Sequence, residues 1–151
     1  MDNPGHALIV GFAITSTVAL ATISIVVRRR QGKPIFPTAP EGVVFTESRA
    51  SGWSDGWRAL GGARNCLMVW IDRETLTIVP FFPFNLMFVG AVWGLEQTIP
   101  RRDVIKVESH AGVLRRTVIV TYRRDLETRR FTLVLRNSEV FVRLLNRSLA
   151  A

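Results

Sequence analysis

The sequence is poor in the residues that catalysis and metal binding use most. Cys66 is the only cysteine among 151 residues, which excludes an intramolecular disulfide and a cysteine-based zinc site and fits a reducing compartment. His110 has no serine, cysteine or metal-ligand companion at a standard spacing. There is no phosphate-binding Gly-Lys loop, no His-Glu-x-x-His motif and no nucleophile elbow. We therefore expect a protein that is not an enzyme and has no catalytic residue, cofactor or metal.

An apolar run long enough to cross a membrane occurs once. Residues Ala7–Val27 form an uncharged run of 21 residues, followed at once by three arginines and then by Lys33. As a helix rising about 1.5 Å per residue, this run spans a hydrocarbon core of about 30 Å. A basic cluster directly after such a run is typical of the cytoplasmic end of a membrane helix. The pattern predicts a single-pass membrane protein with its N-terminus outside and its remaining residues in the cytoplasm.

Two features of the apolar run admit other interpretations. Ala19-Leu20-Ala21 has the small-x-small pattern of a signal-peptide cleavage site, although the first six residues lack the positive charge of a secretory leader. The run also contains hydroxyl side chains, which bond either a partner helix or the carbonyl four residues earlier in their own helix. We favour an uncleaved anchor whose hydroxyls bond their own helix. These residues are Thr15, Ser16, Thr17, Thr22 and Ser24.

Positive charge is concentrated in the C-terminal half of a chain whose net charge is +8. Residues 34–100 carry four arginines against six acidic residues, whereas residues 101–151 carry twelve basic against five acidic residues. Beside a membrane, such charge favours attraction to anionic headgroups, worth about 1 kcal/mol per basic residue near the surface. Aromatic residues do not alternate with the basic ones as base-stacking platforms would require, so we expect no nucleic-acid partner.

The chain divides into three parts. Residues 1–30 are the predicted transmembrane anchor with its basic collar, residues 31–42 are a linker rich in proline and glycine, and residues 43–151 are one cytoplasmic domain. Within the domain, residues 48–64 are rich in glycine, serine and tryptophan. That composition predicts irregular structure with at most one short strand.

Apolar residues predict strands in the rest of the domain, as a continuous run over residues 66–71 and by alternation with polar residues in the later segments. Residues 66–71 and 75–78 predict a hairpin with a tight turn between them. Residues 104–108 predict another strand, with Ile105 and Val107 facing inward.

The C-terminal third continues the pattern of strands and adds a helix. Residues 117–122 and 129–136 predict two strands on either side of a charged turn. The spacing of apolar residues after them predicts an amphipathic helix. Its predicted apolar face consists of Val140, Phe141, Leu144, Leu145 and Leu149.

This order of antiparallel strands and a final helix resembles the pleckstrin-homology-like (PH-like) superfold, a bent β-sandwich of seven strands closed by a C-terminal helix. More narrowly, residues 43–147 resemble the membrane-anchored PH-like or GRAM-like proteins of bacteria. The matching segments are residues 51–53, 64–67, 76–80, 99–105 and the final helix, with the Ile-Pro step at 99–100 the most recognisable. The resemblance implies a mainly β fold with a C-terminal α-helix, preceded by one transmembrane helix, in a bacterial inner membrane.

Residues 81–93 form an apolar segment that is too short to cross a bilayer. Three interpretations remain open: a loop that dips into the membrane interface, a docking surface for a membrane partner, or a core strand followed by a bend. Pro80 and Pro83 favour an edge or loop at the start of the segment. The candidates for apolar docking are Phe81, Phe82, Phe84, Leu86, Met87, Phe88 and Trp93.

Basic residues in the collar and the middle strands form a second candidate surface. They either contact anionic phospholipids, such as phosphatidylglycerol or cardiolipin, or form a solvated face of the sheet. The candidates for headgroup contact are Arg28, Arg29, Arg30, Lys33, Arg101, Arg102, Lys106, Arg115 and Arg116.

Together these patterns predict a non-catalytic accessory or scaffold subunit of an inner-membrane protein complex, with an integral membrane protein as its partner. The alternative is a sensor or binder of anionic headgroups at the cytoplasmic membrane surface. The two differ in salt dependence, because lipid binding through charge weakens as salt rises through about 0.15 M.

Overall fold

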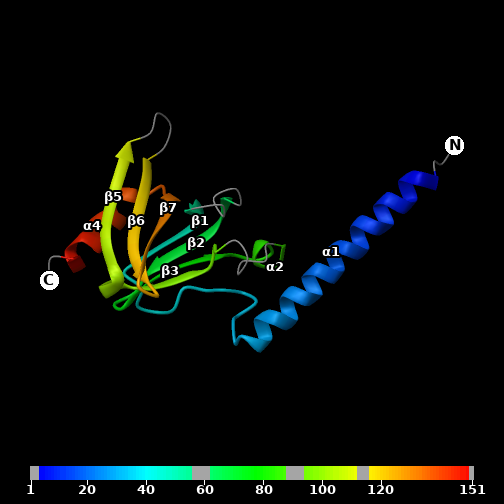
Figure 1. The fold of residues 1–151 in the computed structure, drawn as a ribbon, viewed down its shortest axis with the longest axis horizontal. Helices are drawn as coiled ribbons and strands as arrows, with labels where there is room; N and C mark the ends of the chain where they lie inside the picture. The colour runs from blue at the N-terminus through cyan, green and yellow to red at the C-terminus, as the bar shows by residue number, and fades with distance from the viewer. Residues whose placement is uncertain (1–3, 56–61, 88–93, 112–115, 150–151) are drawn as a thin grey trace.

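The computed structural model describes residues 4–55, 62–87, 94–111 and 116–149, together with their side chains except those of residues 4–10, 13, 87, 148 and 149. A long helix projects from a β-rich domain, and a shorter helix ends the chain (Figure 1). The elements are α1 (Pro4–Arg30), β1 (Phe45–Ser54), β2 (Ala63–Ile71), β3 (Thr75–Pro80), α2 (Phe84–Met87), β4 (Gln97–Pro100), η2 (Arg101–Asp103), β5 (Val104–Ala111), β6 (Arg116–Arg124), β7 (Glu127–Val134) and α4 (Ser138–Leu149).

The strands of the described residues form a single seven-stranded sheet in the order β4-β3-β2-β1-β7-β6-β5. Every pair of neighbours is antiparallel. Because β1 pairs with both β2 and β7, the first strand joins the two halves of the sheet. The prediction of a mainly β fold with a C-terminal helix is confirmed as an antiparallel open sheet followed by α4.

The core lies between the two halves of this sheet, which therefore bends round on itself. Leu76 and Ile78 of β3 belong to the same cluster of buried side chains as Val118 and Val120 of β6. Phe141 of α4 is fully buried in that cluster, so the final helix covers one side of it. Burial of this apolar surface, worth roughly 25 cal/mol per Å2, holds the bent sheet together.

A polar contact also joins the two halves. Tyr122 of β6 donates its hydroxyl to Oε1 of Gln97 on β4 at 3.3 Å, and Arg124 donates to the same oxygen at 2.7 Å. The Gln97 amide in turn donates to the Gly94 carbonyl at 2.7 Å. Gln97 is buried, so these hydrogen bonds satisfy a side chain that would otherwise be costly to remove from water.

Both predicted hairpins are confirmed. β2 and β3 form the expected hairpin, in which Asp72 accepts the backbone N–H groups of Glu74 and Thr75 at 2.7 and 2.6 Å. β6 and β7 form the second expected hairpin. Its turn residues Asp125 and Leu126 both have positive φ, 51° and 65°, as tight hairpin turns require.

The expectation of irregular structure over residues 48–64 is wrong for its described ends. Residues 48–54 belong to β1 and residues 63–64 begin β2. Gly52 explains why a glycine occupies a paired strand here, because a Cβ at this position would lie 2.6 Å from the Thr132 carbonyl of β7. The local composition therefore gave a wrong prediction, because Gly52 allows β1 and β7 to approach closely and does not form part of a loop.

Two apolar positions that were predicted to face the core are exposed. Ile105 is 46% exposed, because the pairing of β5 with β6 shifts by one residue between Val104 and Lys106 and turns Val104 inward instead. In α4, Val140 is 47% exposed, since it lies about 100° away from the buried Phe141 on the helix surface.

α1 has 27 residues and ends in three arginines. Among the residues that the structure describes, no helix combines the length and the apolar content required of a membrane span.

Candidate functional site

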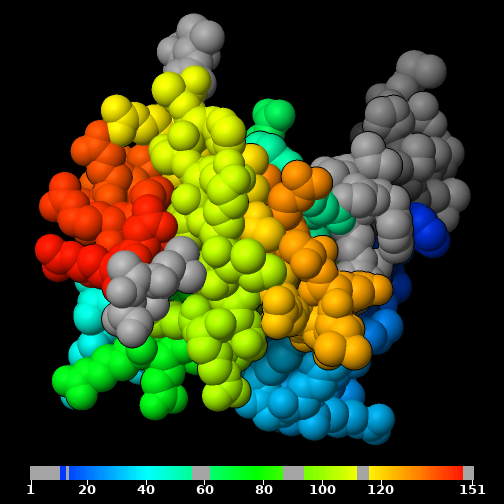
Figure 2. All heavy atoms as spheres, turned by 60° about the vertical axis from the view of Figure 1, so that its left-hand side comes forward, coloured from blue at the N-terminus to red at the C-terminus, as the bar shows by residue number. Residues whose placement is uncertain are grey.

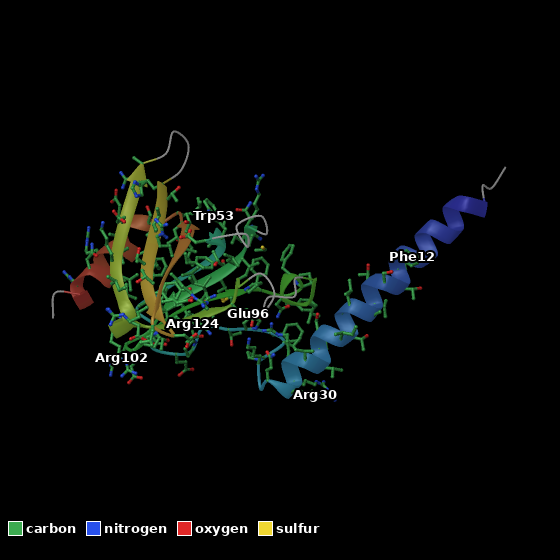
Figure 3. All side chains as sticks on the ribbon, viewed as in Figure 1. Phe12, Arg30, Trp53, Glu96, Arg102 and Arg124 are labelled. Carbon is green, nitrogen blue, oxygen red and sulfur yellow. The ribbon has the colours of Figure 1, made fainter. Side chains whose placement is uncertain are left out.

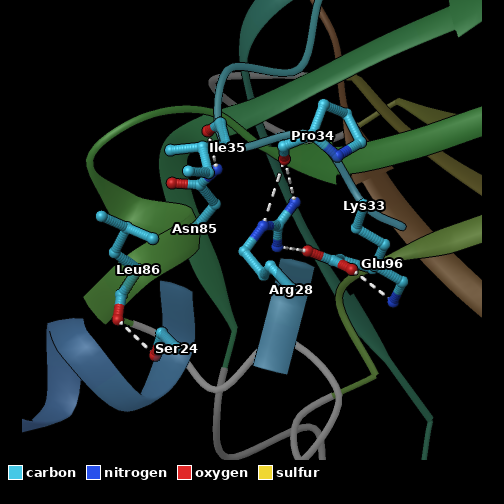
Figure 4. A network of polar contacts seen from close by, with 8 residues as sticks. All are labelled: Ser24, Arg28, Lys33, Pro34, Ile35, Asn85, Leu86 and Glu96. Atoms are coloured by element: carbon cyan, nitrogen blue, oxygen red, sulfur yellow. Dashed lines mark hydrogen bonds and ion pairs between the residues drawn. The ribbon is translucent and has the colours of Figure 1, made fainter. Parts of the chain in front are cut away.

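Arg28, in the last turns of α1, ties the helix to the domain. Its guanidinium forms an ion pair with Glu96, which lies just before β4, and the two side chains are only 8% and 9% exposed. The same guanidinium donates two hydrogen bonds to the Pro34 carbonyl, from Nε at 3.2 Å and from Nη2 at 2.9 Å. Lys33 Nζ lies 2.7 Å from the other carboxylate oxygen of Glu96. Figure 4 shows these contacts converging where α1, the linker and the domain meet.

Glu96 is the acidic residue that pairs with both cations of this junction. Burial alone acts to raise the pKa of the Glu96 carboxyl, but hydrogen bonds from Lys33 and Arg28 and the charges of both residues outweigh it. The pKa of Glu96 therefore lies below its ordinary value. The junction is a largely buried carboxylate held between two cations.

A second contact lies one helical turn earlier in α1. Ser24 Oγ donates a hydrogen bond to the Leu86 carbonyl of α2 at 2.9 Å. Asn85 Nδ2 of α2 donates to the Ile35 carbonyl of the linker at 2.5 Å. Asn85 is 2% exposed, and its Oδ1 has no partner in the described part of the chain. α2 is therefore bonded to both α1 and the linker (Figure 4).

The hydroxyls of α1 divide into two groups. Thr15 donates to the Gly11 carbonyl at 2.9 Å and Thr22 to the Val18 carbonyl at 2.8 Å, as predicted for bonding within one helix. Ser24 departs from that prediction because it bonds the domain.

An aromatic pair lies next to the junction. Phe36 of the linker and Phe82, two residues before α2, have ring centroids 4.8 Å apart. Both rings remain open to solvent, at 63% and 44% exposure. Exposed aromatic side chains that pack on one another form an apolar surface available to a partner.

The basic collar splits into two pairs. Arg28 and Lys33 are engaged by Glu96 and turn toward the domain rather than toward a headgroup. Arg29 and Arg30 are exposed, and no described residue pairs with either of them. The end of α1 lies below the β6–β7 hairpin (Figure 2), where Arg124 borders a hollow of about 360 Å3 together with Arg28 and Lys33.

The basic candidates on the domain do not gather into one patch. Arg101 donates to backbone carbonyls of Asp72, Arg73 and Leu144 at 3.2, 3.4 and 3.1 Å, so it links the β2–β3 turn to α4. Arg102 is exposed on the side of the domain away from Arg30 (Figure 3).

The remaining basic candidates have acidic partners or lie outside the description. Lys106 pairs with Glu108 at 2.8 Å, and Arg116 pairs with Glu139. Arg115 lies outside the described residues. Arg116 pairs with Ala111 at the end of β5, whereas Arg102 precedes the start of that strand, so the two arginines are separated by the length of β5, about 23 Å at about 3.3 Å per residue. Figure 2 shows α4 lying alongside β5 on this face.

The apolar segment 81–93 also divides. Phe81 and Phe84 pack partly against the core, with ring centroids 5.3 Å apart, and Leu86 is buried. These residues are buried or half-buried, as a core segment would be, but Phe84 and Leu86 lie in the short helix α2 and not in the predicted core strand. Phe82 alone of the described aromatic candidates in the segment is exposed beyond a third. The side chain of Met87 and residues Phe88 and Trp93 lie outside the description.

The sequence prediction missed Glu96, Asn85 and Phe36. Glu96 is the only acidic residue between Glu74 and Asp103. An isolated acid next to an apolar segment was a usable signal, because such a carboxylate requires a buried cation when it is not exposed. Nothing local marked Asn85 or Phe36, since their partners lie 50 and 46 residues away in the sequence.

Comparison with known proteins leaves the family open. No protein-family model matches the chain, and no curated protein sequence shows significant similarity to it.

Proposed function

We propose that this protein is a non-catalytic accessory or scaffold subunit of a bacterial inner-membrane complex. In this proposal α1 is its transmembrane anchor, and the sheet with α4 is a PH-like domain on the cytoplasmic side. The observation that carries the proposal is the junction, where Arg28, Lys33 and Ser24 bond the end of α1 to the domain. A domain fixed to its anchor has a set position and orientation at the membrane, which suits a scaffold.

The apolar surface of α1 supports the assignment as an anchor. Seven large apolar side chains on its described part are 42% to 76% exposed, and the run Ala7–Val27 contains no charge. Lipid or a partner helix would cover this surface. The exposed side chains are Phe12, Ile14, Val18, Leu20, Ile23, Val26 and Val27.

The sheet order and the state of Cys66 support the remaining elements of the proposal. A bent antiparallel sheet of seven described strands with a C-terminal helix agrees with the PH-like resemblance. Cys66 is buried, and burial raises the pKa of its thiol, which disfavours the nucleophilic thiolate.

The test is purification of the full-length protein from its native membranes in mild detergent, with mass spectrometry of the proteins retained. We expect an integral membrane protein in stoichiometric amount that remains bound at high salt, because the contact is mainly apolar. Recovery of the protein alone would contradict the proposal.

A variant pair makes the test specific. Phe36→Ser with Phe82→Ser removes the exposed aromatic pair and is expected to release the partner without lowering the melting temperature. The matched control is Leu126→Ser, because Leu126 is 98% exposed at the β6–β7 turn, and it is expected to retain the partner. Equal loss in both variants would place the contact elsewhere.

A second candidate function is binding of anionic phospholipid at the membrane surface. Arg29 and Arg30 favour it, because both are exposed and unpaired among the described residues at the end of α1. This function predicts that phosphatidylglycerol copurifies with the protein and is lost as salt rises, whereas the scaffold contact persists.

A further inference from the structure

A cleft of about 800 Å3 lies at the edge of the domain and brings together side chains that were considered separately above with others that were not. Its walls come from β1, Asn65 of β2, the segment from Phe81 to the start of α2, the start of β6, and the turn between β7 and α4. We call it the arginine cleft, because Arg49, Arg116 and Arg136 line it together with Glu47, Phe81 and Phe84.

Arg49, which lines the arginine cleft, has an unusual backbone conformation. Its φ is +62°, a region that residues other than glycine rarely adopt. The pairing of β1 with β2 shifts between Ser48 and Ala50, so Arg49 is the extra residue of a β-bulge. Bulges redirect a side chain and are over-represented beside functional sites. A second register shift follows between Ala50 and Gly52, and Asn65 of β2 also has a positive φ of 52°, so the pairing of β1 with β2 is irregular along this wall of the cleft.

The arginine cleft has more free positive charge than negative charge. Arg49 and Arg136 are exposed, and no described carboxylate pairs with either guanidinium. Glu47 is occupied, because its two carboxylate oxygens accept the backbone N–H groups of Arg136 at 2.7 Å and Asn137 at 3.0 Å. Arg116 is paired with Glu139, although that pair is exposed and therefore weak.

Phe81 and Phe84 give the arginine cleft an apolar wall. Phe84 belongs to α2, whose Leu86 carbonyl accepts the hydrogen bond from Ser24. The cleft and the contact between α1 and the domain therefore share the element α2.

We propose that the arginine cleft binds an acidic, partly apolar peptide segment of the membrane partner. Arg49 and Arg136 would contact its carboxylates, and Phe81 and Phe84 its apolar side chains. Each Glu47 oxygen accepts one backbone N–H and keeps a second lone pair, so a peptide N–H can also donate to it. A phosphodiester carries acceptors on its phosphate and would meet that carboxylate unfavourably. The inference deepens the proposed scaffold function and rests on it for the source of the peptide.

The test uses the full-length protein in neutral detergent and a fluorescein-labelled octapeptide of alternating glutamate and leucine. We expect fluorescence anisotropy to report binding at least tenfold tighter than that of the same peptide with lysine in place of glutamate. Arg49→Gln with Arg136→Gln should weaken binding at least tenfold. The control, Arg123→Gln with Arg143→Gln, removes equal charge from exposed positions outside the cleft and should change it less than twofold.

Several outcomes would overturn the inference. They are equal binding of the glutamate and lysine peptides, equal loss in the two double variants, or displacement of the peptide by an equimolar amount of short-chain phosphatidylglycerol. Arg136 lies outside the strands, so the single variant Arg136→Gln still tests the proposal if the Arg49 variant does not fold. Because this assay needs no partner, peptide binding without a copurifying membrane protein would overturn the scaffold function and leave the cleft assignment standing.

Discussion

Arg28 and Glu96 lie 68 residues apart in the sequence and form an ion pair in which both side chains are less than a tenth exposed. The pair joins the end of α1 to the segment before β4, and Lys33 reinforces it from the linker. Desolvation of two charges is costly, so the pair is held by geometry and by the additional hydrogen bonds to Pro34. The ion pair therefore fixes the orientation of α1 relative to the domain.

Glu96→Gln should loosen the junction. The substitution leaves Arg28 buried beside a neutral amide, and removal of one partner from a buried ion pair costs about 3 kcal/mol. Hydrogen exchange and limited proteolysis of residues 31–42 should both increase. Glu41→Gln, an exposed acid in the same linker, should leave both unchanged. Unaltered protection in the Glu96 variant would mean that the ion pair does not hold the linker.

The junction should also respond to acid. Because the pKa of Glu96 is lower in the folded protein than its ordinary value near 4.5, its contribution to stability is present above pH 4.5 and is lost as the pH falls through the lowered value. Linker protection should therefore be flat from pH 7 to 5 and decline below about 4.5. Glu96→Gln should remove that decline. A decline that begins between pH 6 and 7 would contradict the assignment.

Arg101→Ala should affect stability rather than membrane contact. Arg101 donates to three backbone carbonyls that connect the β2–β3 turn with α4, so its loss should lower the free energy of unfolding by about 1 to 3 kcal/mol. The neighbouring Arg102 is exposed, and Arg102→Ala should change the free energy of unfolding by less than about 0.5 kcal/mol. Denaturant titration compares the two, and equal effects would show that Arg101 has no structural role.

Gly52→Ala should destabilise the domain. The added Cβ would lie 2.6 Å from the Thr132 carbonyl and 2.9 Å from the Phe131 ring, so β1 and β7 would have to separate. Overpacking of this kind costs about 1 to 3 kcal/mol. Gly11→Ala meets nothing within 4 Å and serves as the control. A melting temperature equal to the parent's would imply that β7 can shift without loss of pairing.

The elements with the clearest local pattern were predictable. Leu76 and Ile78 alternate with threonines, and Val118, Val120 and Tyr122 alternate along β6, so each strand carries its own signal of which face is buried. β1 lacked that signal, because Gly52 and Arg49 interrupt its pattern. Gly52 allows close contact with β7, and Arg49 forms a bulge against β2. Neither contact is visible in the local sequence.

The candidate site was predictable only in its chemistry. The sequence by itself determined that a basic cluster follows a long apolar run, that the chain has one cysteine, and that strands precede a final helix. Only the tertiary structure decided that Arg28 turns inward to Glu96, that Arg101 braces α4, and that two unpaired arginines border one cleft. The physical reason is that periodicity records which face of an element is apolar, whereas ion pairs and clefts depend on which distant elements the bent sheet brings together.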